Sequence, residues 1–113
     1  GVANDPDFAS LPAGALVTGA WGVCKTAFVG TGTLDIGFAN AAGTAIDADG
    51  IDAAVDVDTV WGSVGASIVH DGALVDGTDT LSARGWVYAA KTGTISAGVA
   101  EIVLEYIVTD ATV

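Results

Sequence analysis

Residues 31–58 read TGTLDIGFANAAGTAIDADGIDAAVDVD, and this stretch decides the fold class. In its first part, apolar residues recur at every second position as Leu34, Ile36 and Phe38. Successive side chains of a β-strand point to opposite faces, so this alternation predicts a strand over residues 33–38 with one buried face.

A second alternating run extends from Ile51 to Asp58. We expect its apolar side to face the core and its aspartate-rich side to face water. Gly43, Asp49 and Gly50 lie between the two runs and are typical of turns. The apolar side consists of Ile51, Ala53, Val55 and Val57, and the side expected to face water consists of Asp52, Ala54, Asp56 and Asp58.

Composition extends this prediction to the whole chain of 113 residues, which contains 16 glycines and two prolines. The length favours one domain. Glycine costs about 1 kcal/mol relative to alanine inside a helix, so strands joined by glycine turns are favoured over long helices.

Further strands are predicted over residues 15–28, 64–70, 80–90 and 99–109. Asp71-Gly72 and Asp76-Gly77 supply turns between them. In the first strand we expect Val17, Trp21 and Val23 on one side and Leu16, Ala20 and Cys24 on the other. In the last we expect a core face of Ala100, Ile102, Leu104, Tyr106 and Val108. The sequence therefore predicts an all-β, single-domain antiparallel β-sandwich that is jelly-roll-like.

The first residues are too polar and too rich in proline for a core strand. We interpret residues 1–12 as an N-terminal arm and residues 13–113 as the sandwich domain. The arm is either a frayed terminus or a segment that docks Phe8 and Leu11 on a partner.

The formal net charge of −11 bears on possible partners. Nucleic-acid binding relies on Lys and Arg at phosphates, so this surface predicts repulsion from DNA, RNA and anionic membranes. A single cysteine, Cys24, excludes an internal disulfide and fits a reducing cytoplasm. In an apolar strand it is predicted to be a small buried hydrophobe.

Aspartates between residues 47 and 58 could suggest a calcium loop. Counted from Asp47, however, the twelve-residue pattern has Asp52 where glycine is required and Asp58 where a bidentate glutamate is required. We therefore favour a solvated face without a metal, with a cation held between two loops as the alternative. The residues concerned are Asp47, Asp49, Asp52, Asp56 and Asp58.

Ser67, His70 and Asp71 contain the residue types of a catalytic triad. Residues three apart on an extended chain point to opposite faces, so Ser67 and His70 are not expected to meet. His70 is predicted to be a surface or hydrogen-bonded residue, and the chain is predicted not to be an enzyme.

The large aromatic residues allow three interpretations, namely core packing, a subunit interface or a sugar-stacking platform. Trp21 and Trp86 are our candidates for contacts between subunits. The full set is Trp21, Trp61, Trp86, Tyr88 and Tyr106.

Four segments resemble small virion proteins of tailed bacteriophages: LPAGA at residues 11–15, TAFVG at 26–30, TLDIG at 33–37 and AEIVLEY at 100–106. The resemblance implies a capsid decoration or cement protein, or the shell-bound domain of a head fibre. It implies the major capsid protein as partner, many copies or a homo-oligomer on the outer surface of the virion, and synthesis in the host cytoplasm. It brings no catalytic residues and no cofactor.

Two other classes of function stay open on the sequence. One is a ligand- or carbohydrate-binding sandwich whose aromatic residues line a face or loop. The other is a structural component of a tail or baseplate with the same fold.

Overall fold

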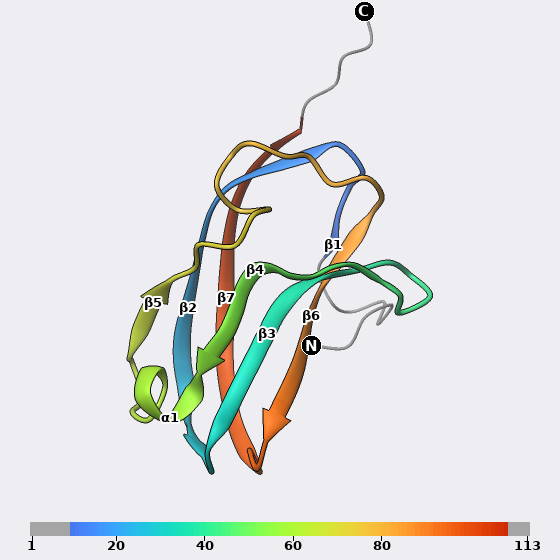
Figure 1. The fold of residues 1–113 in the computed structure, drawn as a ribbon. Helices are drawn as coiled ribbons and strands as arrows, with labels where there is room; N and C mark the ends of the chain where they lie inside the picture. Colours follow the sequence, from blue (N-terminus) through green and yellow to red (C-terminus); the bar gives the residue numbers. More distant parts are fainter. Residues whose placement is uncertain (1–9, 109–113) are drawn as a thin grey trace, which may run out of the picture.

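A long two-stranded antiparallel ribbon that folds back over itself organises the computed structural model, which describes residues 10–108 (Figure 1). One half of the ribbon pairs β2 with β7, and the other half pairs β3 with β6. The elements are β1 Ser10–Leu11, β2 Ala15–Val29, β3 Gly32–Ala39, β4 Ala45–Asp56, α1 Val57–Val60, β5 Ser67–Val69, β6 Gly85–Gly93 and β7 Ala97–Val108.

The ribbon bends where both of its strands pass from one sheet to the other. Thr94 N–H donates to Thr31 O over 2.8 Å, and Ser96 N–H donates to Val29 O over 3.0 Å, so pairing continues through the bend. Gly93 has a φ of 105°, in the region that favours glycine, and it ends β6. This rolled ribbon is the jelly-roll-like feature of the fold.

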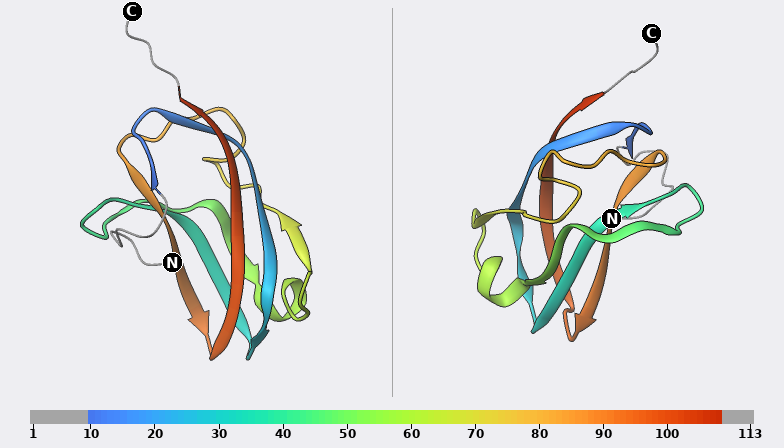
Figure 2. Two further views of the ribbon diagram at one scale, coloured as in Figure 1. Left: turned by 180° about the vertical axis from the view of Figure 1, so that it is seen from behind. Right: turned by 45° about the horizontal axis from the view of Figure 1, so that its top comes forward.

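Two antiparallel sheets result, with strand orders β1-β6-β3-β4 and β5-β2-β7. Figure 2 shows the two sheets stacked on each other. Buried side chains from both sheets form one shared core. The predicted β-sandwich is thus confirmed. The largest fully buried side chains are Trp61, Phe38, Ile51, Val17, Val57 and Cys24.

The strand predicted from the deciding stretch is confirmed as β3. Ile36 and Phe38 are buried, and Leu34 packs against them at the edge of the core. The turn that follows lies at residues 40–44, where Asn40 N–H donates to Thr44 O over 2.8 Å. Asp49 and Gly50 do not form a turn, contrary to our expectation, because β4 begins at Ala45 and runs through them.

The expected faces of β4 are only partly correct. Val55 and Val57 are buried and Asp56 and Asp58 exposed, as predicted, whereas Asp52 is buried and Ala53 exposed. The cause is irregular pairing with β3: two residues of β3 span five residues of β4 on one side of Asp52 and three on the other. Such bulges turn residues out of the simple alternation.

The other predicted strands differ mainly in length. The strand expected over residues 64–70 is reduced to β5, and the one expected over 80–90 begins only at Gly85 as β6. The inner face of β7 is half-buried at Ala100, Ile102 and Leu104. Tyr106 and Val108, which we expected in the core, are 42% and 57% exposed, because no strand within residues 10–108 covers that end of β7.

The arm boundary at residue 12 also needs correction. Ser10 and Leu11 form β1, and Leu11 is in the core at 7% exposure. Leu11 is therefore not free to dock on a partner. Phe8 lies outside the described residues.

Candidate functional site

An apolar row crosses the outer face of the three-stranded sheet. Trp21 of β2 lies directly opposite Val69 of β5 on one side and Val103 of β7 on the other. Trp21 is 38% exposed, Val69 is 65% exposed and Val103 is 43% exposed. Side chains directly opposite each other in a sheet have Cβ atoms roughly 5 Å apart, so the three form one contiguous surface. We call Val69, Trp21 and Val103 the apolar row.

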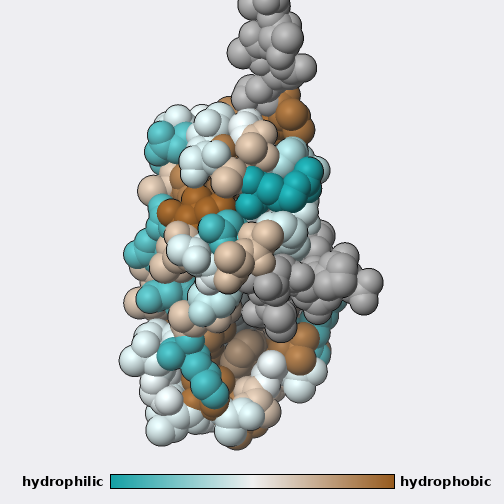
Figure 3. All heavy atoms as spheres, turned by 90° about the vertical axis from the view of Figure 1, so that its right-hand side faces the viewer, coloured by the Kyte–Doolittle hydropathy of each residue, from teal (hydrophilic) through white to brown (hydrophobic). Residues whose placement is uncertain are grey.

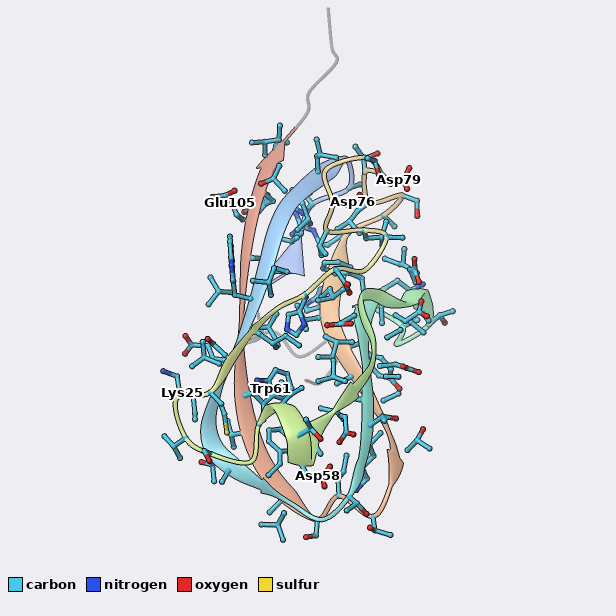
Figure 4. The ribbon with its side chains drawn as sticks, turned by 60° about the vertical axis from the view of Figure 1, so that its left-hand side comes forward. Lys25, Asp58, Trp61, Asp76, Asp79 and Glu105 are labelled. Carbon is cyan, nitrogen blue, oxygen red and sulfur yellow. The ribbon has the colours of Figure 1, made fainter. Side chains whose placement is uncertain are left out.

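Acidic residues of β7 flank the apolar row. Glu101 and Glu105 are exposed two positions before and after Val103 and share its face. Thr18 Oγ1 donates to Glu105 Oε1 over 3.0 Å, which holds this carboxylate beside the row. Figure 4 shows Glu105 and Lys25 projecting from this side of the sheet.

A bulge in β2 exposes Trp21. The pairing of β2 with β7 shifts register between Val17 and Gly19, so Val17 and Ala20 both face inward and Trp21 faces outward. Our expectation that Val17 and Trp21 share a face was therefore wrong. The ring of Trp21 lies over Gly19, where a Cβ would come within 2.9 Å of Trp21 Cη2.

The other aromatic residues do not join the apolar row. Trp86 and Tyr88 are half-buried and belong to the four-stranded sheet, opposite Ala39 and Gly37 of β3. Trp61 is fully buried between the sheets (Figure 4). Trp21 and Trp86 thus lie on different sheets, and the structure does not bring the two proposed contact residues together.

His70 and Asp52 form a buried polar pair inside the sandwich. His70 Nδ1 lies 2.8 Å from Asp52 Oδ2, with the imidazole side chain 0% and the carboxylate side chain 12% exposed. The ring of His70 also meets the edge of Trp61 at 5.9 Å between centroids. His70 Nε2 and Trp61 Nε1 are buried and have no hydrogen-bond partner within residues 10–108.

Replacing Asp52 with alanine is expected to lower the free energy of unfolding by about 1–3 kcal/mol, because it leaves His70 Nδ1 buried without a partner. Urea denaturation would measure the change. Asp71→Ala is the matched control: Asp71 is exposed and adjacent to His70, and its loss should cost no more than about 0.5 kcal/mol. Equal losses in the two variants would contradict a structural role for the pair.

The triad interpretation gains no support from the geometry. Ser67 is exposed on β5, His70 is buried, and Asp71 is exposed, so the imidazole points away from the serine. The carboxylate that contacts His70 comes instead from β4, eighteen residues earlier. Sequence reasoning missed Asp52 because it assigned that residue to the solvated side of its strand.

Cys24 is buried, as the sequence predicts. It is 0% exposed, and its Sγ lies 3.3 Å from Thr26 O and 3.3 Å from Trp61 O. The thiol thus helps to hold Trp61 against β2.

The aspartates of residues 47–58 form two separate pairs around the buried Asp52. Burial, followed by a hydrogen bond with Asp49, raises the pKa of Asp47. A hydrogen bond between Asp56 and Asp58 lowers the pKa of the first and raises that of the second. Within residues 10–108, no three His, Cys, Asp or Glu side chains are placed to hold a metal ion.

Comparison of the chain with protein-family models, curated proteins and solved structures finds no match. Among the described residues, no helix has the length and apolar character needed to cross a membrane.

Proposed function

We propose that this chain is a structural protein that binds the outer surface of a phage head and stabilises the shell, with the apolar row as its contact surface. The observation that carries the proposal is the exposed row of Val69, Trp21 and Val103 on an otherwise acidic domain. The resemblance of four sequence segments to small phage virion proteins supplies the identity of the partner, the major capsid protein.

The geometry of the row suits a protein partner. It crosses three neighbouring strands at one level, and tryptophan is enriched among the residues that dominate interface energies. The flanking carboxylates Glu101 and Glu105 would form a polar rim around it.

The net charge of −11 supports the outer surface of the head. Packaged DNA repels an acidic domain, so a position facing the genome is disfavoured. Many copies on one shell would let weak individual contacts add up to reinforcement.

Mixing the purified protein with undecorated heads tests this proposal. Trp21→Ala is expected to weaken binding roughly thirtyfold, since truncating a hot-spot residue costs about 2 kcal/mol or more. Trp86→Ala, on the other sheet, is the matched control and should bind like the unmodified chain. Co-sedimentation with heads over a concentration series would give both affinities.

Absence of binding by the unmodified protein would overturn the proposal. Binding to tails rather than heads would instead favour a tail or baseplate component, and binding on a glycan array would favour a carbohydrate module. Equal affinities for heads in the Trp21→Ala variant and the unmodified chain would reject the apolar row as the contact surface.

A further inference from the structure

A large groove opens along one side of the sandwich, between the inner faces of β6 and β7. Its volume is about 1040 Å³, and its lining is mainly apolar. Figure 3 faces this side and shows apolar side chains recessed in its lower half. Apolar side chains of both sheets therefore border one open space. They include Ile36 of β3, Val87 and Ala89 of β6, and Ile102, Leu104 and Tyr106 of β7.

β7 forms one wall of this groove and is an edge strand, since β2 is its only neighbour in the described part of the chain. In an antiparallel strand, alternate residues turn both backbone groups toward the same neighbour. Ala20 O accepts from His70 N–H over 2.8 Å, so Ala20 of β2 faces away from β7. Leu104, which lies opposite Ala20, therefore turns its own N–H and C=O to the free edge of β7.

The same alternation holds along the strand. Cys24 N–H donates to Ala66 O over 2.8 Å, and Val17 O accepts from Gly77 N–H over 3.0 Å, so Cys24 and Val17 also face away from β7. Their opposite residues in β7 turn to the free edge in the same way as Leu104. The residues with a free backbone edge are Ala100, Ile102, Leu104 and Tyr106, and all of them line the groove.

This combination of edge and groove suits an extended peptide. An unpaired strand edge is a ready template for an added strand, whose backbone would bond to the edge while alternate side chains enter the groove. An alkyl chain could fill the groove but has no donors or acceptors for the backbone groups of β7. The structure therefore favours a peptide over a lipid.

The outer side of the same edge is acidic. Glu101 and Glu105 are the only charged residues of β7, and neither forms an ion pair with another described residue. Opposite charges on facing positions of two strands stabilise their pairing. An added strand should therefore have Lys or Arg opposite each of these glutamates.

Charge also decides between a second copy and a different protein. A second copy that paired through its own β7 would bring two more glutamates to this edge. Two chains of net charge −11 also repel each other. A basic segment of another protein is the better occupant.

We propose that an extended segment of a partner protein adds to the free edge of β7 as an antiparallel strand, with apolar side chains in the groove and Lys or Arg opposite Glu101 and Glu105. The residues opposite positions 101–105 of β7 would read basic, apolar, apolar, apolar, basic. The central one would lie opposite Val103 and extend the apolar row. The proposal stands apart from capsid binding, because its test requires no phage head.

A synthetic peptide, Thr-Val-Lys-Val-Val-Val-Lys-Val-Thr, is the probe. Its two lysines share one face of a strand and can lie opposite Glu101 and Glu105, while alternate valines enter the groove. The peptide Thr-Val-Val-Lys-Val-Val-Lys-Val-Thr is the matched control. It has the same composition and charge, but its lysines point to opposite faces of a strand, so one of them faces the groove in every register.

Isothermal titration calorimetry would compare the affinities of the two peptides. The control is expected to bind roughly tenfold more weakly or less, because it places a charged side chain in an apolar groove and loses an opposite-charge pair. Equal affinities, or no binding of the probe, would overturn the proposal.

Amide hydrogen exchange measured by nuclear magnetic resonance would locate the bound peptide. At saturation, exchange is expected to slow roughly tenfold or more at Ile102 and Leu104, whose N–H groups face the free edge. Val103 is the internal control, since its N–H faces β2 and should change little. Unchanged exchange at Ile102 and Leu104 would reject the added strand.

A charge exchange supplies a further readout. The double variant Glu101→Lys, Glu105→Lys should lose affinity for the probe roughly tenfold or more, because like charges then face each other. Replacing both lysines of the probe with glutamate should restore binding to this variant. Both substituted side chains are exposed, so the fold should persist, and circular dichroism would check it. Failure of the restored pair to bind would reject the pairing of basic residues with these glutamates.

Discussion

Replacing Trp61 with alanine is expected to lower the free energy of unfolding by about 3–5 kcal/mol, the range for deleting a large aromatic side chain from a core. Trp61 is 0% exposed, stacks on Phe28 at 5.5 Å between ring centroids, and contacts His70 with its edge. The loss would be a large share of the 5–15 kcal/mol that usually stabilises a domain.

The backbone around Trp61 makes collapse of the resulting cavity difficult. Trp61 N–H donates to Val57 O over 2.9 Å at the end of α1, and Phe28 N–H donates to Trp61 O over 3.1 Å. These bonds hold the segment in place, so little relaxation can fill the space left by the indole.

Chemical denaturation would measure this effect, with Trp21→Ala as the matched tryptophan control. Trp21 is 38% exposed on the outer face, so its truncation should cost about 1 kcal/mol or less. Similar losses in the two variants would show that Trp61 is not a main element of the core. A small loss for Trp21→Ala would also separate its effect on head binding from any effect on folding.

The second large effect is expected for Gly22→Ala. Gly22 is buried in the middle of β2, and an added Cβ would overlap Trp61 Cζ2 and His70 Nε2. Both rings are fully enclosed, so neither can swing into solvent. Overpacking of this kind typically costs about 1–3 kcal/mol.

Gly19→Ala is the matched control on the same strand. The three atoms nearest to its added Cβ all belong to the ring of Trp21, with Cη2 at 2.9 Å, and that ring is exposed and can move. Alanine also reduces the entropy of the unfolded chain by about 0.4–1 kcal/mol, so the net change at residue 19 should be small. Thermal unfolding would compare the stability losses of the Gly22→Ala and Gly19→Ala variants. Equal shifts in Tm would contradict the proposed crowding at Gly22.

Local sequence patterns were sufficient to predict the inner faces of the regular parts of β3 and β7. The alternation of Leu34, Ile36 and Phe38 correctly gave the inner face of β3, and that of Ala100, Ile102 and Leu104 gave the inner face of β7. These predictions succeeded because both strands carry the alternation without interruption over the residues concerned.

Irregular pairing caused the errors in β2 and β4. In β2, the bulge near Gly19 places Trp21 and Val17 on opposite faces of the sheet, although we expected them on the same face. In β4, irregular pairing on both sides of Asp52 turned that carboxylate inward. Gly19 and Gly50 lie at these irregular positions, and glycine inside a strand is compatible with a bulge. The glycines do not reveal which side chains turn inward, since the partner strand decides which residue is left unpaired.

Candidate sites were predicted in part. Trp21 was singled out from residue type alone, while its neighbours Val69 and Val103 were missed because they come from strands distant in sequence. His70 was expected to be hydrogen-bonded or on the surface, but its partner Asp52 could not be identified without the tertiary structure.

By itself, the sequence determined an acidic all-β domain, because strand alternation, glycine content and net charge are local or additive properties of the chain. Only the tertiary structure decided which side chains are exposed in β2, which carboxylate meets His70, and that a groove lies open between β6 and β7. These features depend on the register between strands far apart in the chain, and a shift of one residue moves a side chain to the opposite face of its sheet.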